Sequence, residues 1–177
     1  MAYERFVEDG RADEVLVARS VVSALGGSVE WATRYEDTEQ HVDFWWRVPD
    51  KSHPGLLAII GVDVKGMRKI RREDAAPSND ITWLETRNVN GKPGSLYGKA
   101  SYIAFVRIGK ILLVNREKLL AFALEKIAGK TVSTDRPSCC YAPYSRVKSG
   151  RNDLVFMARL DDIEAIAEHI VPIAPQG

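Results

Sequence analysis

Two aspartates interrupt apolar segments that lie close together in the sequence. Asp43 lies inside the segment HVDFWWRV at residues 41–48, and Asp63 directly follows the apolar run LLAIIGV at residues 56–62. A carboxylate surrounded by valine, isoleucine and tryptophan side chains costs several kcal/mol if it has no partner. We therefore expect this pair of aspartates to hold a cation.

Lys65 lies two residues after Asp63. Side chains two residues apart in a strand point to the same face, so Lys65 and Asp63 are expected to be neighbours. Mg²⁺ prefers carboxylate, carbonyl and water oxygens; it stabilises charge on a phosphoryl oxygen and lowers the pKa of a bound water. A lysine beside it can orient the attacking water or stabilise charge on the phosphate. The pattern predicts metal-dependent chemistry on a phosphate ester.

A buried ion pair without a metal is the structural alternative. In that interpretation Asp43 or Asp63 pairs with Lys65 or Arg47. Such buried pairs contribute little to stability, and apolar residues of similar size often serve as well. The sequence leaves this alternative open.

Two predicted strands joined by a turn position the aspartates. Residues 41–48 and 56–65 read as strands, and residues 49–55 read as a turn with Pro49 at its start and Gly55 at its end. The second strand is apolar on both faces before Asp63, which is typical of the middle of a sheet covered by helices. Pairing of the two strands would bring the carboxylates together.

A predicted helix at residues 11–25 precedes these strands. Val15, Ala18, Val22 and Leu25 recur at helical spacing, and two glycines stop the helix. Glu14 lies one residue before this stripe, at the edge of the expected buried face, so it can reach a site at the rim of the core. Alternatively, Glu14 is a solvated residue that the helix dipole favours.

The remaining pattern predicts more strands, two more helices and one domain. The final helix is expected to begin at Asp161 and to end at Pro172, and its apolar residues as far as Ile170 are expected to face the core. The order predicts a mixed α/β (α+β) domain with a central mixed sheet flanked by helices. We expect a single domain over residues 1–177, with a core at about 11–128 and an extension at 130–177. The other expected elements are strands at 81–87, 101–106, 110–114 and 154–158 and a helix at 116–128.

Two basic segments are candidates for contact with phosphates. The first follows Lys65 directly, and the second lies in the irregular stretch 130–152, where basic residues alternate with tyrosines. Positive charge binds a nucleic-acid backbone, and aromatic rings stack on bases. Solvated surface loops are the alternative for both segments. The candidate nucleic-acid-binding residues are Arg68, Lys69, Arg71, Arg72, Tyr144, Arg146, Lys148 and Arg151.

The acidic pair and its lysine resemble the active site of the PD-(D/E)XK nuclease superfamily. The order is similar to that of archaeal Holliday-junction resolvases and type II restriction enzymes, and the resemblance covers about residues 11–90. It implies a restriction-endonuclease-like core and an endonuclease that hydrolyses DNA with Mg²⁺, for which Mn²⁺ can substitute. The matching residues, in chain order, are Glu14, Asp43, Asp63, Val64 and Lys65.

The resemblance also implies a role for each matching residue. Asp43 and Asp63 would bind the metal together with the carbonyl of Val64. Lys65 would position the attacking water, and Glu14 would join the metal shell or hold Lys65.

The chain departs from the pattern of the superfamily at two positions. Val42, rather than a proline, precedes Asp43. Glu85, on the next predicted strand, is a rival to Glu14 for the metal, so the resemblance leaves open which glutamate completes the site.

Composition narrows the function classes. A net charge of +1 gives no basic field over the whole protein, so any nucleic-acid contact must be local. No apolar run is long enough to cross a membrane and the N-terminus has no signal-like segment, so we expect a cytoplasmic protein. The two adjacent cysteines, Cys139 and Cys140, are expected to be reduced thiols, too few for a zinc site.

Two hypotheses for the function are therefore favoured. The first is a Mg²⁺-dependent nuclease with a nucleic acid, expected to be DNA, as its partner; a homodimer would serve for cutting both strands. The second is a catalytically inactive nuclease-like module that binds nucleic acid or a protein partner. A small-molecule or structural α/β protein, in which the acidic pair is only a salt bridge, is a third possibility.

Overall fold

Contacts divide the chain into two compact units, each assembled from segments that are distant in sequence. The computed structural model describes residues 2–71 and 73–174, and for residues 2–10 it describes the backbone alone. The first unit comprises Met1–Gly66, Lys99–Val114 and Ala167–Gly177, and the second comprises Met67–Gly98 and Asn115–Ile166. The expectation of one domain over 1–177 stays a prediction. Among the described helices, none has the length and apolar character to span a bilayer.

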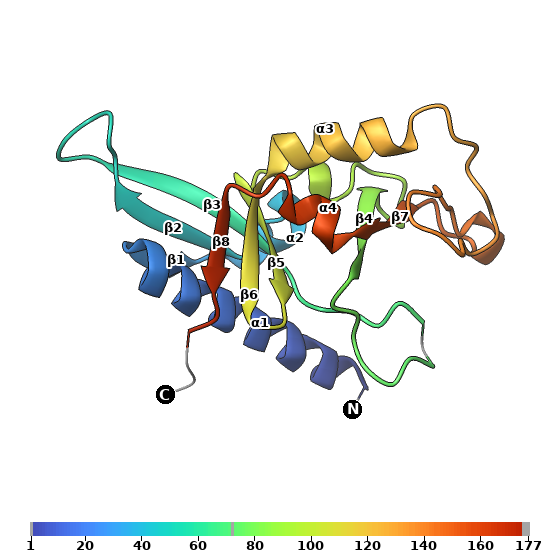
Figure 1. Ribbon diagram of the computed structural model, residues 1–177, viewed down its shortest axis with the longest axis horizontal. Helices are drawn as coiled ribbons and strands as arrows, with labels where there is room; N and C mark the ends of the chain where they lie inside the picture. The colour runs from blue at the N-terminus through green and yellow to red at the C-terminus, as the bar shows by residue number, and fades with distance from the viewer. Residues whose placement is uncertain (1, 72, 175–177) are drawn as a thin grey trace. The chain divides into compact units, whose positions relative to one another are not determined.

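A six-stranded mixed sheet forms the first unit (Figure 1). Its first three strands are neighbouring and antiparallel, β3 and β5 are parallel, and β6 and β8 are antiparallel. The predicted class, a mixed α/β chain with a mixed central sheet, is confirmed. In spatial order the strands are β1 (Ser28–Trp31), β2 (Phe44–Pro49), β3 (Leu57–Lys65), β5 (Tyr102–Arg107), β6 (Lys110–Asn115) and β8 (His169–Pro172).

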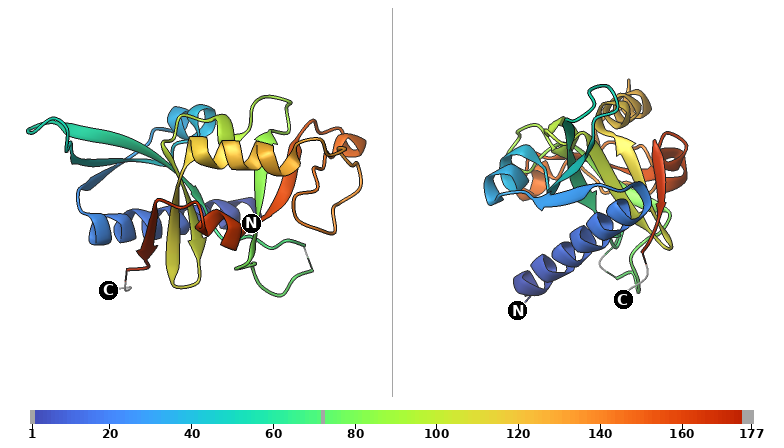
Figure 2. Two further views of the ribbon diagram at one scale, coloured as in Figure 1. Left: turned by 45° about the horizontal axis from the view of Figure 1, so that its top comes forward. Right: turned by 90° about the vertical axis from the view of Figure 1, so that its left-hand side faces the viewer.

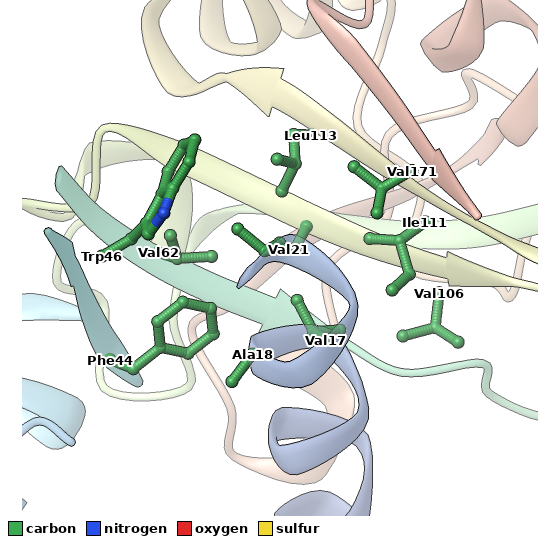
Figure 3. Packing of buried hydrophobic residues seen from close by; sticks show 11 residues of the cluster. Val17, Ala18, Val21, Phe44, Trp46, Val62, Val106, Ile111, Leu113 and Val171 are labelled. Carbon is green, nitrogen blue, oxygen red and sulfur yellow. The ribbon is translucent and has the colours of Figure 1, made fainter. Parts of the chain in front are cut away.

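Helix α1 (Ala2–Leu25) packs its apolar stripe against this sheet. It ends where predicted, because Gly26 has a positive φ of 77°. The buried stripe is shifted from the predicted one: Val17, Ala18 and Val21 are buried, whereas Val15 is exposed. The side chains that meet this stripe from the sheet include Phe44, Trp46, Val62, Val106, Ile111, Leu113 and Val171 (Figure 3).

The β2–β3 hairpin extends beyond its neighbouring strands. Its turn at residues 50–56 lies at the tip of the projecting hairpin (Figure 2). Strand β5 pairs only with Val62–Lys65, so the first half of β3 has β2 as its one neighbour. Leu57 and Ile59 are consequently exposed by 57% and 58%. The expectation that β3 is covered on both faces is therefore wrong for its first half.

Strands β4 (Ile81–Arg87) and β7 (Leu154–Arg159) form a separate two-stranded antiparallel sheet in the second unit. Burial alternates along β4, since Thr82, Leu84 and Thr86 are buried whereas the residues between them are only partly buried. The central sheet predicted from the sequence does not include β4. Local alternation specifies a strand but not its partner, because pairing depends on residues about 70 positions away. The unit also contains α3 (Arg116–Ile127), α4 (Leu160–Glu164), η1 (Ser95–Tyr97) and η2 (Val147–Ser149).

The predicted final helix is wrong in its second half. Helix α4 ends at Glu164, and His169–Pro172 form strand β8 along β6. Val171 is buried, whereas Ile170, which was expected to face inward on a helix, is exposed. Two adjacent β-branched residues favour a strand, and pairing with β6 satisfies backbone groups at the edge of the sheet.

Candidate acidic site and basic cavity

Asp63 lies near the end of β3 in the first unit and is almost completely buried, with 4% of its surface exposed. One carboxylate oxygen, Oδ1, accepts a hydrogen bond from Lys65 Nζ at 2.8 Å. The other, Oδ2, is buried and has no hydrogen-bond partner in the described part of the chain. A buried oxygen without a partner carries a desolvation cost that a bound cation would remove.

Asp43 directly precedes β2, where the hairpin register brings it beside Asp63. Its backbone N–H donates to the carbonyl of Val62 at 2.8 Å. Its Oδ2 accepts a hydrogen bond from the backbone N–H of Val64 at 2.5 Å. Both bonds join the start of β2 to the end of β3. The predicted approach of the two aspartates is therefore observed.

Burial and the negative charge of Asp63 raise the pKa of Asp43 to about 7. The hydrogen bond from Val64 and the positive charge of Lys65 oppose this shift, and Glu14 adds to it. A like charge nearby makes a second ionised carboxylate unfavourable. The ionised forms of the two aspartates therefore repel each other, and the positive charge of Lys65 compensates for this repulsion only in part.

Lys65 shares a face of β3 with Asp63, as strand periodicity predicts. Its side chain is half-buried and forms an ion pair with Asp63. Arg47, the other cation named in the structural alternative, instead pairs with Glu30 on β1. The ion pair between Asp63 and Lys65 is therefore the observed form of the ion-pair alternative.

Glu14 lies on α1, one helical turn before the buried residues Val17 and Ala18. Its side chain is 21% exposed and accepts a hydrogen bond from Arg11 at 3.3 Å. Burial raises the pKa of Glu14; Arg11 opposes this, and the charges of Asp37 and Asp13 add to it. The predicted position at the rim of the core agrees with this intermediate burial.

Asp13 is a further carboxylate near the site that was not predicted from the sequence. A Cβ atom at Gly66 would overlap the carboxylate group of Asp13, so this group lies against the backbone just after Lys65. The signal in the sequence is weak: an aspartate next to Glu14, and a glycine directly after the D-x-K motif.

The donor set around the acidic pair fits a divalent cation only in part. Two adjacent carboxylates, one with a buried oxygen that has no hydrogen-bond partner in the described part of the chain, are ligands of the kind that Mg²⁺ or Mn²⁺ binds. Among the side chains that the structure describes, at residues 11–71 and 73–174, however, no three from histidine, cysteine, aspartate or glutamate are grouped closely enough to hold a metal. The roles of Glu14 and of the Val64 carbonyl at a metal stay predictions.

Glu85 lies on β4, in the second unit, and lines a cavity there. Its suggested role as a rival to Glu14 for the metal stays a prediction. The cavity brings together several predicted nucleic-acid-binding residues from both basic segments. Its lining comprises Lys69, Ile70, Arg71, Trp83, Glu85, Arg136, Tyr144, Arg146 and Val155.

The other predicted basic residues do not line this cavity. Arg68 and Arg151 are exposed, and Lys148 forms a surface ion pair with Asp135 at 2.9 Å. Arg72 lies outside the described residues. Trp83 and Arg136 also line the cavity, but they were not predicted. Trp83 lies in a predicted strand and Arg136 is an isolated arginine in a loop, so no sequence pattern linked the two residues to one site. Both cysteines are free.

Comparison with protein-family models, with curated proteins and with solved structures finds no match to this chain.

Proposed function

We propose that the protein is a Mg²⁺-dependent nuclease that hydrolyses DNA phosphodiester bonds at the acidic pair of the first unit. The observation that carries the proposal is the Asp43–Asp63 pair: coupled, poorly solvated carboxylates with one buried oxygen that lacks a partner. A bound divalent cation would compensate the negative charge of the two carboxylates. The resemblance to PD-(D/E)XK nucleases supports the same assignment.

Each residue of the site has its own role in the proposed reaction. Asp43 and Asp63 hold the cation, and the N–H of Val64 fixes the orientation of the Asp43 carboxylate. The cation, when bound, supplies positive charge to a phosphoryl oxygen and activates water. Lys65 is directed by Asp63 and can place its ammonium beside the attacking water or the charged phosphate. Glu14 stays a candidate to assist Lys65.

A cleavage assay tests the proposal. Purified protein is incubated with linear, branched and single-stranded DNA and with RNA, in Mg²⁺ or Mn²⁺. We expect cleavage of at least one DNA substrate and its loss in Asp63→Asn and in Lys65→Ala. The matched control is Glu30→Gln, which breaks an exposed ion pair in the same unit and should cut normally. An inert wild type on every substrate with either metal would contradict the proposal.

A second candidate is a catalytically inactive module that binds nucleic acid or a protein partner. The observation that favours it is that the described side chains offer no group of three metal ligands. This module would retain nucleic acid without cutting it, and Asp43→Asn would leave that binding unchanged. Retention on DNA that is insensitive to salt would count against a phosphate-binding function of either kind.

A further inference from the structure

The cavity in the second unit has the size and composition of a small-ligand site. Its volume is about 640 Å³, within the roughly 300–1,000 Å³ that is typical of such sites. All of its lining residues belong to the second unit. The site therefore requires nothing from the acidic pair, and the inference goes beyond the proposed hydrolysis.

Three adjacent backbone segments form one side of the cavity. Glu85 on β4 is paired with Val155 on β7. The N–H of Tyr144 donates to the carbonyl of Val155 at 2.9 Å, and the N–H of Val155 donates to the carbonyl of Tyr144 at 3.0 Å. Trp83 lies two residues before Glu85, on the same face of β4. This arrangement holds two aromatic side chains, Trp83 and Tyr144, at one cavity.

Arg146 is fixed in place by a buried carboxylate. Its guanidinium donates to Asp153, which has 0% of its surface exposed, and its backbone N–H donates to the same carboxylate at 3.1 Å. Burial raises the pKa of Asp153, but the hydrogen bonds and positive charge of Arg146 outweigh burial, so that the pKa is lowered. Arg146 therefore shapes the wall, and its charge is largely neutralised.

Three further cations remain to attract an anion. The guanidinium of Arg136 donates to the carbonyl of Ile70 and so ties its loop to the first basic segment. Lys69 and Arg71 line the cavity, and neither side chain forms an ion pair with another described residue. Cations that line a concave surface without a paired carboxylate favour binding of a phosphate group.

The combined features select one class of ligand. A simple anion such as phosphate would not use the aromatic rings of Trp83 and Tyr144. An uncharged aromatic molecule would not use the positive charges that line the cavity. We propose that the cavity binds one nucleoside monophosphate, with its phosphate at Lys69, Arg71 and Arg136 and its base against an aromatic ring. The carboxylate of Glu85 accepts hydrogen bonds and so suits an amino group of the base. The monophosphate can be a free nucleotide or the phosphorylated end of a single strand.

Binding of defined probes tests this inference. The probes are deoxyadenosine monophosphate, deoxyadenosine, inorganic phosphate, and one single-stranded oligonucleotide with a 5′-phosphate or a 5′-hydroxyl. They are titrated into the full chain with a chelator present, so that cleavage plays no part, and are followed by tryptophan fluorescence and calorimetry. We expect the nucleotide or the 5′-phosphorylated strand to bind at least about tenfold more tightly than its phosphate-free counterpart or inorganic phosphate.

Matched variants assign the binding to the cavity. Arg71→Ala should weaken binding by about tenfold or more. Lys92→Ala removes an exposed positive charge from the same unit but lies outside the cavity, and should leave binding unchanged. Trp83→Phe keeps a ring and should retain binding, whereas Trp83→Leu should lose it, with thermal unfolding confirming that each variant is folded.

Three results would overturn the inference. One is the absence of saturable binding by both the free nucleotide and the 5′-phosphorylated strand. Another is an equal effect of Arg71→Ala and Lys92→Ala. The last is inorganic phosphate binding as tightly as the nucleotide, which would leave no contribution from the base. Preference for the nucleotide or for the strand identifies the source of the ligand and supports the inference either way.

Discussion

At the scale of single residues, the fold strongly alters the acid–base chemistry of Asp43. Burial and the charge of Asp63 raise its pKa to about 7, well above its ordinary value of 3.8. A carboxylate with such a pKa is half-protonated at neutral pH, and a metal must displace that proton before it can bind. Binding of a cation and ionisation of Asp43 are therefore coupled.

The first prediction concerns the pH dependence of metal binding. Below the pKa of Asp43, each fall of one pH unit should weaken Mn²⁺ binding by about tenfold, because one more proton competes. Above that pKa the affinity should level off. Calorimetric titration at about pH 6 and about pH 8 measures the difference. An affinity that is the same at both pH values would mean that Asp43 is not a ligand.

The second prediction concerns stability without metal. Between about pH 4 and about pH 7 the native state holds a proton on Asp43 that the unfolded chain has lost, so stability falls as pH rises through this window. Asp43→Asn has no such group. At about pH 8, with a chelator, it should raise the free energy of unfolding by roughly 1–3 kcal/mol, and near pH 4 it should change little. Urea denaturation at both pH values checks this. A variant less stable than wild type at the higher pH would contradict it.

At the scale of elements, the β2–β3 hairpin positions the site but is only partly covered. Ile59 lies in its projecting half and is 58% exposed, whereas Ile111 on β6 is 0% exposed. Both are isoleucines on strands of the same sheet. They differ in burial because β5 pairs with the second half of β3 alone.

The third prediction uses these two isoleucines as a matched pair. Ile111→Ala should cost about 2–5 kcal/mol, because it leaves a cavity in the core. Ile59→Ala should change stability by no more than about 0.5 kcal/mol, because its side chain already contacts water. Chemical denaturation of both variants measures the contrast. Equal losses would mean that the exposed face of the hairpin is covered in solution.

Much of the element scale could be predicted from the sequence. Hydrophobic periodicity located β2, β3 and β4 and, with the glycines after Leu25, residues 11–25 of α1, although this helix begins at Ala2. Strand periodicity placed Asp63 and Lys65 on one face. Exposure along β3 could not be predicted, because it depends on where its neighbours end. The approach of Asp13 to Gly66 was missed for the same reason, since it is a contact between a helix and a distant loop.

At the scale of the whole molecule, charge is nearly balanced, with a net value of +1. Binding of a nucleic acid must then come from local cations, and the basic residues that line the cavity are one such group. Pairing between distant segments created this group. Strand β7 pairs with β4, which carries Trp83, and its Val155 forms backbone hydrogen bonds with Tyr144. No local sequence pattern specifies that these two aromatic residues lie at one cavity.

The fourth prediction follows from this local charge. On a single strand, each phosphate contact contributes about 0.7 to the steepness of the fall of log affinity with log salt concentration. Arg71→Ala should therefore weaken binding to single-stranded DNA and reduce this slope by about 0.7. Arg19→Ala, which removes an exposed charge on α1, should leave the slope unchanged. Filter binding over a salt series gives both slopes, and identical slopes for the two variants would argue against phosphate contact by Arg71.

The most direct test of the central claim is a crystal structure of the protein grown with Mn²⁺, examined by anomalous diffraction. If Asp43 and Asp63 form a divalent-cation site, an anomalous peak should lie in contact with both carboxylates and be absent in Asp63→Asn. Mn²⁺ bound only elsewhere, with Asp63 still paired to Lys65 alone, would contradict the account and identify the acidic pair as a structural ion pair.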